Sequence, residues 1–94
     1  MSSNAYRQKV EAKLEGYQAK LDGQRAKLKG GSADTRLKAE KQITELQSKL
    51  NDAKTKAAKL ADAGDDAWKN LTKDLDDKLE GLASAVKGFF SKSD

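Results

Sequence analysis

Cysteine, histidine and proline are absent from this chain of 94 residues, and each absence excludes a class of structure or chemistry. Without cysteine the chain has no disulfides, no thiolate nucleophile and no thiolate metal site. Without histidine it lacks the usual general base near neutral pH and the commonest metal ligand. Without proline, no helix is interrupted by a residue that lacks an amide hydrogen.

Large apolar residues are scarce as well. Leu, Ile, Val and Phe total 16 residues, a share that is typical of disordered chains. The net charge of only +4 and the regular spacing of these residues argue against disorder. Ala, Glu, Lys, Leu and Arg make up 49 residues, a composition typical of coiled coils and long helices. One apolar stripe on a lone helix cannot offset the entropy of ordering the chain. We therefore expect such stripes to bury against each other, within one chain or between chains.

Long hydrophobic runs are also missing. No window has the length of a signal-peptide core or approaches the roughly 20 apolar residues of a spanning helix. We therefore expect a soluble, cytoplasmic protein, with association to a membrane surface left open. Asn70-Leu71-Thr72 matches the glycosylation acceptor pattern, and we interpret it as a chance match inside a helical segment.

The feature that is present is a stripe of apolar residues along most of the chain. Successive members are three or four residues apart, and a mean step of about 3.5 residues keeps one helix face against a partner helix. The same spacing also includes smaller or polar residues and one further leucine, which are Gln24, Ala39, Ala53, Ala57, Gly64, Ala67 and Leu71. The spacing predicts a coiled-coil seam whose large members are Val10, Leu14, Tyr17, Leu21, Leu28, Ile43, Leu46, Leu50 and Leu60.

Turn and capping signals divide residues 1–94, taken as one domain, into three helical segments. A helix over about 4–29 is capped by Ser2, Ser3 or Asn4, and a Gly-Gly turn follows at 30–32. Ser32 is the expected N-cap of a helix over about 33–63. At 64–66 a kink is expected, with Gly64 as a C-cap and Asp65 as a new N-cap; the alternative is one helix running through. An amphipathic helix over about 66–91 comes last.

The last segment carries the strongest apolar face. Three interpretations compete for it: the core of a bundle, a contact in an oligomer, and a helix lying in a membrane interface. The net acidic character of the segment disfavours anionic lipids, which attract basic helices. We favour core or oligomer contact for this interaction stripe, which consists of Trp68, Leu71, Leu75, Leu79, Leu82, Val86, Phe89 and Phe90.

The fold prediction is accordingly an all-α coiled-coil protein, either a helical hairpin or a three-helix bundle, that self-associates. The Gly-Gly turn between two helices of matched length favours an antiparallel hairpin. The third segment can fold back on this hairpin or pair with another chain, and the sequence does not choose. Trp68 is expected to anchor the junction of the last two segments, and Tyr6 is expected to pack with its hydroxyl reaching water.

The pattern of charged residues favours helix formation and disfavours nucleic acid as a partner. Acid-then-base pairs at a spacing of four stabilise helices by about 0.2–0.5 kcal/mol each; they are Asp34/Lys38, Glu45/Lys49, Asp52/Lys56, Asp65/Lys69 and Asp74/Lys78. Lysines such as Lys54, Lys56 and Lys59 could neutralise phosphates. Because lysines alternate with acids and no aromatic residue lies among them, we consider nucleic-acid binding unlikely.

No motif predicts catalysis. The carboxylates Glu11 and Glu15 lack the histidine that a di-iron bundle needs. The register that starts at Asp74 places Leu79 and Ala85 where an EF-hand loop needs Gly and Glu. We therefore predict that the chain is not an enzyme, and we predict no catalytic residue, metal, cofactor or small-molecule substrate.

Residues 60–71 read LADAGDDAWKNL. With the Lys/Ala/Leu-rich segment before it and the Leu/Phe tail after it, this stretch resembles small bacterial coiled-coil proteins of proteobacteria and cyanobacteria, some of them stress-responsive. The Gly-Asp-Asp-Ala-Trp core at 64–68 is its distinctive part, and the chain departs from the pattern at residues 30–32. The resemblance implies a bacterial, soluble, non-catalytic protein and transfers no site residues.

The function predicted from the sequence is that of a non-catalytic structural or interaction protein that assembles through its amphipathic helices. Its partner would be another copy of the chain or another helical protein. One alternative is a peripheral lipid-binding protein, related to stress, whose last segment lies on a membrane. The other is a weak, non-specific nucleic-acid binder.

Overall fold

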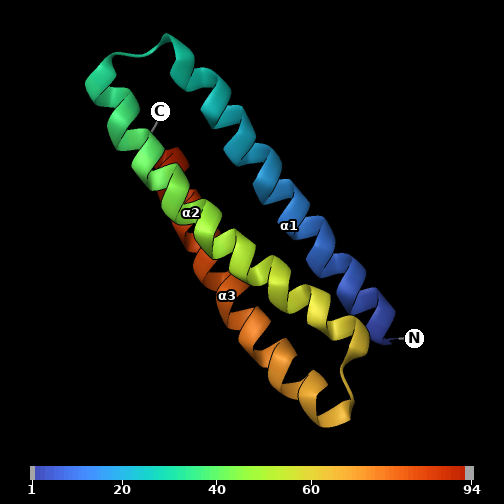
Figure 1. Cartoon of the computed structure of the whole chain (residues 1–94). Helices are drawn as coiled ribbons and strands as arrows, with labels where there is room; N and C mark the ends of the chain where they lie inside the picture. The colour runs from blue at the N-terminus through green and yellow to red at the C-terminus, as the bar shows by residue number, and fades with distance from the viewer. Residues whose placement is uncertain (1, 93–94) are drawn as a thin grey trace.

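The computed structural model describes residues 2–92, with side chains described over residues 5–90. Three long helices follow one another: α1 spans Ser2–Lys27, α2 spans Ala33–Lys59 and α3 spans Asp65–Lys92. Helix α2 runs antiparallel to both other helices, so that α1 and α3 point the same way in a rod of 50 × 19 × 17 Å (Figure 1). The all-α prediction is confirmed, and of the two predicted architectures the chain adopts the three-helix bundle.

Helix α2 starts at the predicted residue, and the other helix ends differ from the predicted ends by one to four residues. Two short 3-10 turns, Leu28–Gly30 and Leu60–Asp62, extend α1 and α2, as is frequent where the last carbonyls of a helix lack partners. Helix α3 starts one residue before the predicted position and ends one residue after it. The predicted capping of α1 by Ser2, Ser3 or Asn4 concerns side chains outside the described set.

The turn between α1 and α2 forms where it was predicted. Ser32 caps α2: its hydroxyl accepts a hydrogen bond from the amide of Thr35 at 3.4 Å, and its carbonyl accepts one from the amide of Arg36 at 2.9 Å. Gly31 has φ −90° and ψ 168°, which is extended backbone that any residue can adopt. The turn therefore does not use the left-handed region that the glycine pair would allow.

The chain also breaks between α2 and α3, and the alternative of one continuous helix is wrong for this fold. Ala63 is extended, with φ −79° and ψ 136°. The carbonyl of Gly64 accepts the first helical hydrogen bond of α3, from the amide of Trp68 at 2.7 Å. Gly64 therefore occupies the N-cap position of α3 and Asp65 is its first residue, which corrects the predicted roles of C-cap and N-cap. Asp65 and Asp66 place negative charge in the first turn, where the helix dipole favours it.

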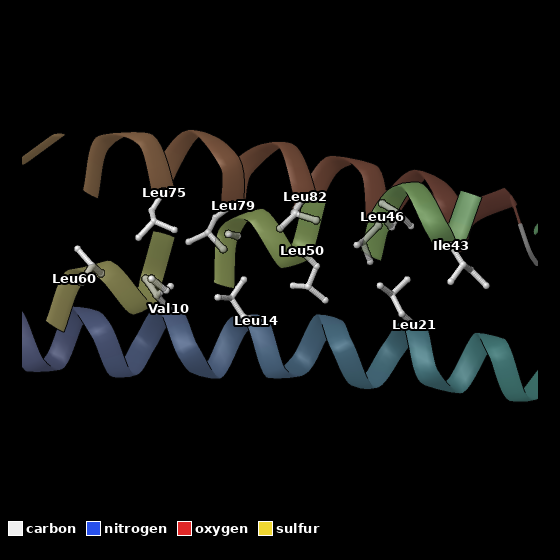
Figure 2. Packing of buried hydrophobic residues seen from close by; sticks show 13 residues of the cluster. Val10, Leu14, Leu21, Ile43, Leu46, Leu50, Leu60, Leu75, Leu79 and Leu82 are labelled. Carbon is white, nitrogen blue, oxygen red and sulfur yellow. The ribbon is translucent and has the colours of Figure 1, made fainter. Parts of the chain in front are cut away.

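The core lies along the axis of the rod and is built from all three helices. Figure 2 shows Val10, Leu14 and Leu21 of α1 pointing toward α3, with side chains of α2 between them. Ala53 and Ala57 of α2 are buried as well, where their small size allows close approach of the neighbouring helices. Of the predicted seam, Tyr17 and Leu28 are half-buried, and the buried members are Val10, Leu14, Leu21, Ile43, Leu46, Leu50 and Leu60.

Candidate interaction surface

The interaction stripe of α3 is mostly inside the bundle. Its central positions are buried against the α1–α2 hairpin: Leu75 is 0%, Leu82 1%, Val86 4% and Leu79 8% exposed. The outer positions Trp68, Leu71, Phe89 and Phe90 are half-buried and pack against the same core. In this fold the centre of the stripe is therefore covered by the chain itself, and neither a membrane nor a second copy can reach it unless α3 leaves the hairpin.

One end of the stripe is held by an aromatic contact between α1 and α3. The rings of Tyr6 and Trp68 meet edge to face, with centroids 5.8 Å apart and an interplanar angle of 67°, an arrangement that aromatic pairs favour. The hydroxyl of Tyr6 donates to Oδ1 of Asp76 at 2.8 Å and approaches the carbonyl of Thr72 at 3.3 Å. The sequence predicted that Tyr6 packs with its hydroxyl reaching water, and it did not predict these two acceptors on α3.

The surroundings of Tyr6 also disfavour its ionised form. Burial raises the pKa of the phenol well above its ordinary value, and the hydrogen bond to the Asp76 carboxylate and the negative charge of that carboxylate raise it further. A tyrosinate at this position would lose the hydrogen bond and face another anion. The neutral phenol is thus part of what holds α3 on α1.

Tyr6→Phe is expected to lower the free energy of unfolding by about 1 kcal/mol, the typical net value of one hydrogen bond. Because folding raises the pKa of Tyr6, the contribution of its hydroxyl is complete below the unfolded-state value of about 10 and is lost as the pH rises through the folded-state pKa. Denaturant titrations of wild type and variant from neutral to alkaline pH measure this. Tyr17→Phe, which removes a hydroxyl without a hydrogen bond among the described residues, is the control. A difference that stays constant into strongly alkaline solution would contradict the assignment.

A polar network joins α1 to α2. The side-chain amides of Gln18 and Gln47 exchange two hydrogen bonds, each of 2.8 Å. Lys54 donates to Gln18 at 2.6 Å, and Arg25 reaches both Gln47 and Asp22 at 3.3 Å. The reciprocal amide pair fixes the register of the two helices because a shift of either helix would break both bonds. This pair was not predicted from the sequence, although Gln18, Asp22 and Arg25 follow one another at steps of four and three beside the seam.

Two of the three lysines that were weighed as phosphate ligands bind side chains of neighbouring helices. Lys54 bonds to Gln18, and Lys56 of α2 forms an ion pair with Asp74 of α3. Within the described side chains, the five predicted i,i+4 pairs do not come within ion-pair distance; Arg7–Glu11 at 3.4 Å and Asp22–Arg25 at 3.3 Å do. The ion pair of Lys56 with Asp74 replaces two of the predicted pairs, because tertiary packing places these two side chains closer than helical spacing does.

The α1–α2 hairpin extends beyond the end of α3 (Figure 1), and basic residues are concentrated on this extension. We define the hairpin tip as residues 25–41. It holds two acidic residues, Asp34 and Glu40, and six exposed basic residues, which are Arg25, Lys27, Lys29, Arg36, Lys38 and Lys41. Its excess of four positive charges equals the net charge of the entire chain, so the remainder is neutral as a whole. This concentration was not predicted from the sequence, because it depends on the turn that brings residues 25–29 and 36–41 to the same end of the rod.

Carboxylates and metal ligands are not gathered into a site in the part of the chain that the structure describes. No group of three or more Asp or Glu side chains lies close enough there to hold a metal ion. Glu11 and Glu15, the pair weighed against a di-iron site, border a shallow hollow of about 370 Å³ together with Lys54.

Comparison with known proteins adds no relative: no protein-family model, curated protein sequence or solved structure matches this chain. The fold therefore defines the class, an all-α three-helix bundle. No helix among residues 2–92 combines the length and apolar character needed to cross a bilayer.

Proposed function

We propose that this chain is a non-catalytic interaction protein that assembles with a second copy of itself by exchanging α3. The proposal keeps the self-association predicted from the sequence but changes its geometry. The apolar stripe of α3 would leave the hairpin of its own chain and pack in the same way on the hairpin of a partner. Exchange of an identical element is a low-cost route to dimers, since the native contacts are re-formed between chains.

The observation that supports this proposal is the continuity of the apolar face across the break. Only Ala63 and Gly64 separate the helical turns of α2 from α3. If these two residues became helical, Leu60, Leu71 and Leu75 would lie on one face at about 100° per residue. The same face holds Leu50 and Leu82. A straight α2–α3 helix would therefore present one unbroken apolar stripe, the open form that a coiled-coil pairing with a second chain requires.

The interface of α3 offers enough specific contacts to be re-formed between chains. Leu75 and Leu82 are fully buried in it. The ion pair of Lys56 with Asp74 and the ring contact of Tyr6 with Trp68 fix the position of α3 along the hairpin. These contacts are identical whether α3 comes from the same chain or from a partner, so the balance depends on the linker and on protein concentration.

Asp65→Pro tests the proposal. Proline fits the first position of a helix, where the amide hydrogen has no helical partner, and this is the position of Asp65 in the closed bundle. In a continuous α2–α3 helix the same proline would be internal and would destabilise the helix by about 3 kcal/mol or more. We expect the sedimentation mass of the wild type to rise with concentration and that of Asp65→Pro to remain that of a monomer with unchanged helicity.

Asp65→Ala is the matched control, because it removes the same charge without restricting the backbone. It is expected to assemble like the wild type. A wild type that remains monomeric at every concentration would contradict assembly itself. Equal assembly of wild type and Asp65→Pro would contradict exchange through a continuous helix.

The resemblance to small bacterial helical proteins, some of them stress-responsive, fits an assembling helical protein. We propose a bacterial setting on the basis of that resemblance, and a cytoplasmic location on the basis of the expectation drawn from the lack of long hydrophobic runs. The resemblance rests on residues 60–71, which include the linker and the start of α3, so the distinctive stretch coincides with the proposed hinge.

A further inference from the structure

The hairpin tip combines two properties that do not occur together elsewhere on the described surface: unpaired positive charge and an exposed large apolar side chain. Of its six basic residues, Arg25 alone forms an ion pair with a described side chain. Leu37, between Arg36 and Lys38, is 66% exposed. Among the side chains that the structure describes, no other large hydrophobic residue is exposed. The surface therefore offers cations and an apolar group at the same end of the rod.

A shallow groove between the two helices strengthens this combination. It has a volume of about 370 Å³ and lies between α1 and the first turns of α2. Leu28 and the buried Ile43 supply its apolar lining, and Arg25, Lys29 and Arg36 line it from both helices. Glu40 and Thr44 complete the lining, so the cations outnumber the single carboxylate by three to one.

We propose that the hairpin tip docks on an anionic lipid surface. The headgroup phosphates and carboxylates would be neutralised by Lys29, Arg36 and Lys38, and Leu37 would enter the boundary between headgroups and acyl chains. Each basic residue near an anionic membrane contributes attraction, and an apolar side chain among cations matches the layered polarity of the interface. This surface is distinct from the α3 stripe, so the proposal is independent of the exchange of α3.

Charge and composition favour lipid over the two other anionic partners. Proteins that bind single-stranded nucleic acid add aromatic stacking to phosphate contacts, and no aromatic residue lies within residues 25–41. The acidic end of a second copy is a poor match, because Asp62, Asp65 and Asp66 are flanked there by Lys59 and Lys69. Neither alternative gives the exposed Leu37 an apolar environment.

The test is co-sedimentation of the full chain with vesicles of phosphatidylcholine and phosphatidylserine, and with vesicles of phosphatidylcholine alone. The wild type is expected to bind the mixed vesicles, more weakly as salt rises, and not the neutral ones. The triple variant Lys29→Gln, Arg36→Gln and Lys38→Gln is expected to bind on the order of a hundredfold more weakly. Leu37→Ser, with all charges intact, is expected to lose about tenfold.

A matched triple variant shows whether vesicle binding depends on the hairpin tip or only on the net charge of the protein. Lys9→Gln, Lys13→Gln and Lys69→Gln removes the same three charges from exposed positions in the other half of the rod and is expected to keep most of the wild-type affinity. All replaced side chains are exposed, so circular dichroism should show unchanged helicity. Failure to bind mixed vesicles, or equal losses in the two triple variants, would overturn the proposal. So would vesicle binding that is indifferent to Leu37→Ser, or tighter binding to duplex DNA than to vesicles.

Discussion

Leu50→Ala is expected to lower the free energy of unfolding by about 2–5 kcal/mol, the range observed for leucine truncations in cores. Leu50 lies in the middle of α2, the helix that packs against both others, and its exposed fraction is 0%. Figure 2 shows its side chain directed into the core near Leu14. The substitution leaves a cavity that three rigid helices can fill only in part, so the lost contacts add to the lost hydrophobic transfer.

Denaturant unfolding followed by circular dichroism measures this effect, at one fixed protein concentration because assembly would add to the apparent stability. Leu37→Ala is the matched control: it makes the same chemical change on the same helix at a side chain that is 66% exposed. Its effect is expected to stay within about 0.5 kcal/mol. Equal losses for the two variants would mean that Leu50 is not in a packed core.

Replacing four glycines with alanine is expected to raise the free energy of unfolding by about 2–4 kcal/mol in total. Gly16 and Gly23 lie inside α1, and Gly81 and Gly88 lie inside α3. None has a positive φ, and an added Cβ would meet no atom within 4 Å at any of them. Each glycine inside a helix is less stable than alanine by about 0.5–1 kcal/mol, because the unfolded chain loses more freedom on folding.

Thermal and denaturant unfolding of the four-alanine variant check this expectation. The reverse change provides the control: Ala12→Gly and Ala19→Gly, at exposed positions of α1, are expected to lower stability by about 1–2 kcal/mol together. If the four-alanine variant is no more stable than the wild type, the space around these glycines is not open to a methyl group, which would contradict the structure. If the gain is found, the glycines keep the stability of this small bundle low. Low stability is the condition under which α3 can leave the hairpin.

The two proposed functions use different surfaces of the molecule. Assembly would use the apolar face of α3, which the closed bundle covers, whereas lipid docking would use the hairpin tip, which the closed bundle leaves open. An assembled pair would carry two tips, and two linked sites bind a surface more tightly than one when both can reach it. The Asp65→Pro variant separates the two, because it is expected to abolish assembly while leaving the tip intact.

Much of the fold followed from local patterns. Glycine pairs and capping residues act over a few neighbours, so the turn at Gly31 and the N-cap at Ser32 could be predicted closely. The seam was predicted from its spacing, and its members from Val10 to Leu60 are buried or half-buried because a repeat of three and four residues keeps them on one helix face. The position of the second break was predicted too, although the roles of Gly64 and Asp65 were not.

The candidate surfaces were harder to predict, because they depend on residues far apart in the chain. The hydrogen bond of Tyr6 to Asp76 spans 70 positions, and the pairing of Gln18 with Gln47 depends on the register of two helices. No local rule relates such residues. The apolar face of α3 suited a core and an oligomer contact equally well, and only its net acidic charge argued against a membrane, since each of these environments removes the same side chains from water.

The sequence alone determined that this protein is helical, where its helices turn, and which face of each helix avoids water, because these properties depend on neighbours within a few positions. Tertiary structure alone decided that α3 folds back on its own hairpin, that Lys56 pairs with Asp74 rather than with Asp52, and that the basic hairpin tip stands clear of α3. The physical reason is that burial of an apolar face does not depend on which partner covers it, whereas hydrogen bonds and ion pairs between distant residues require one particular arrangement of the helices.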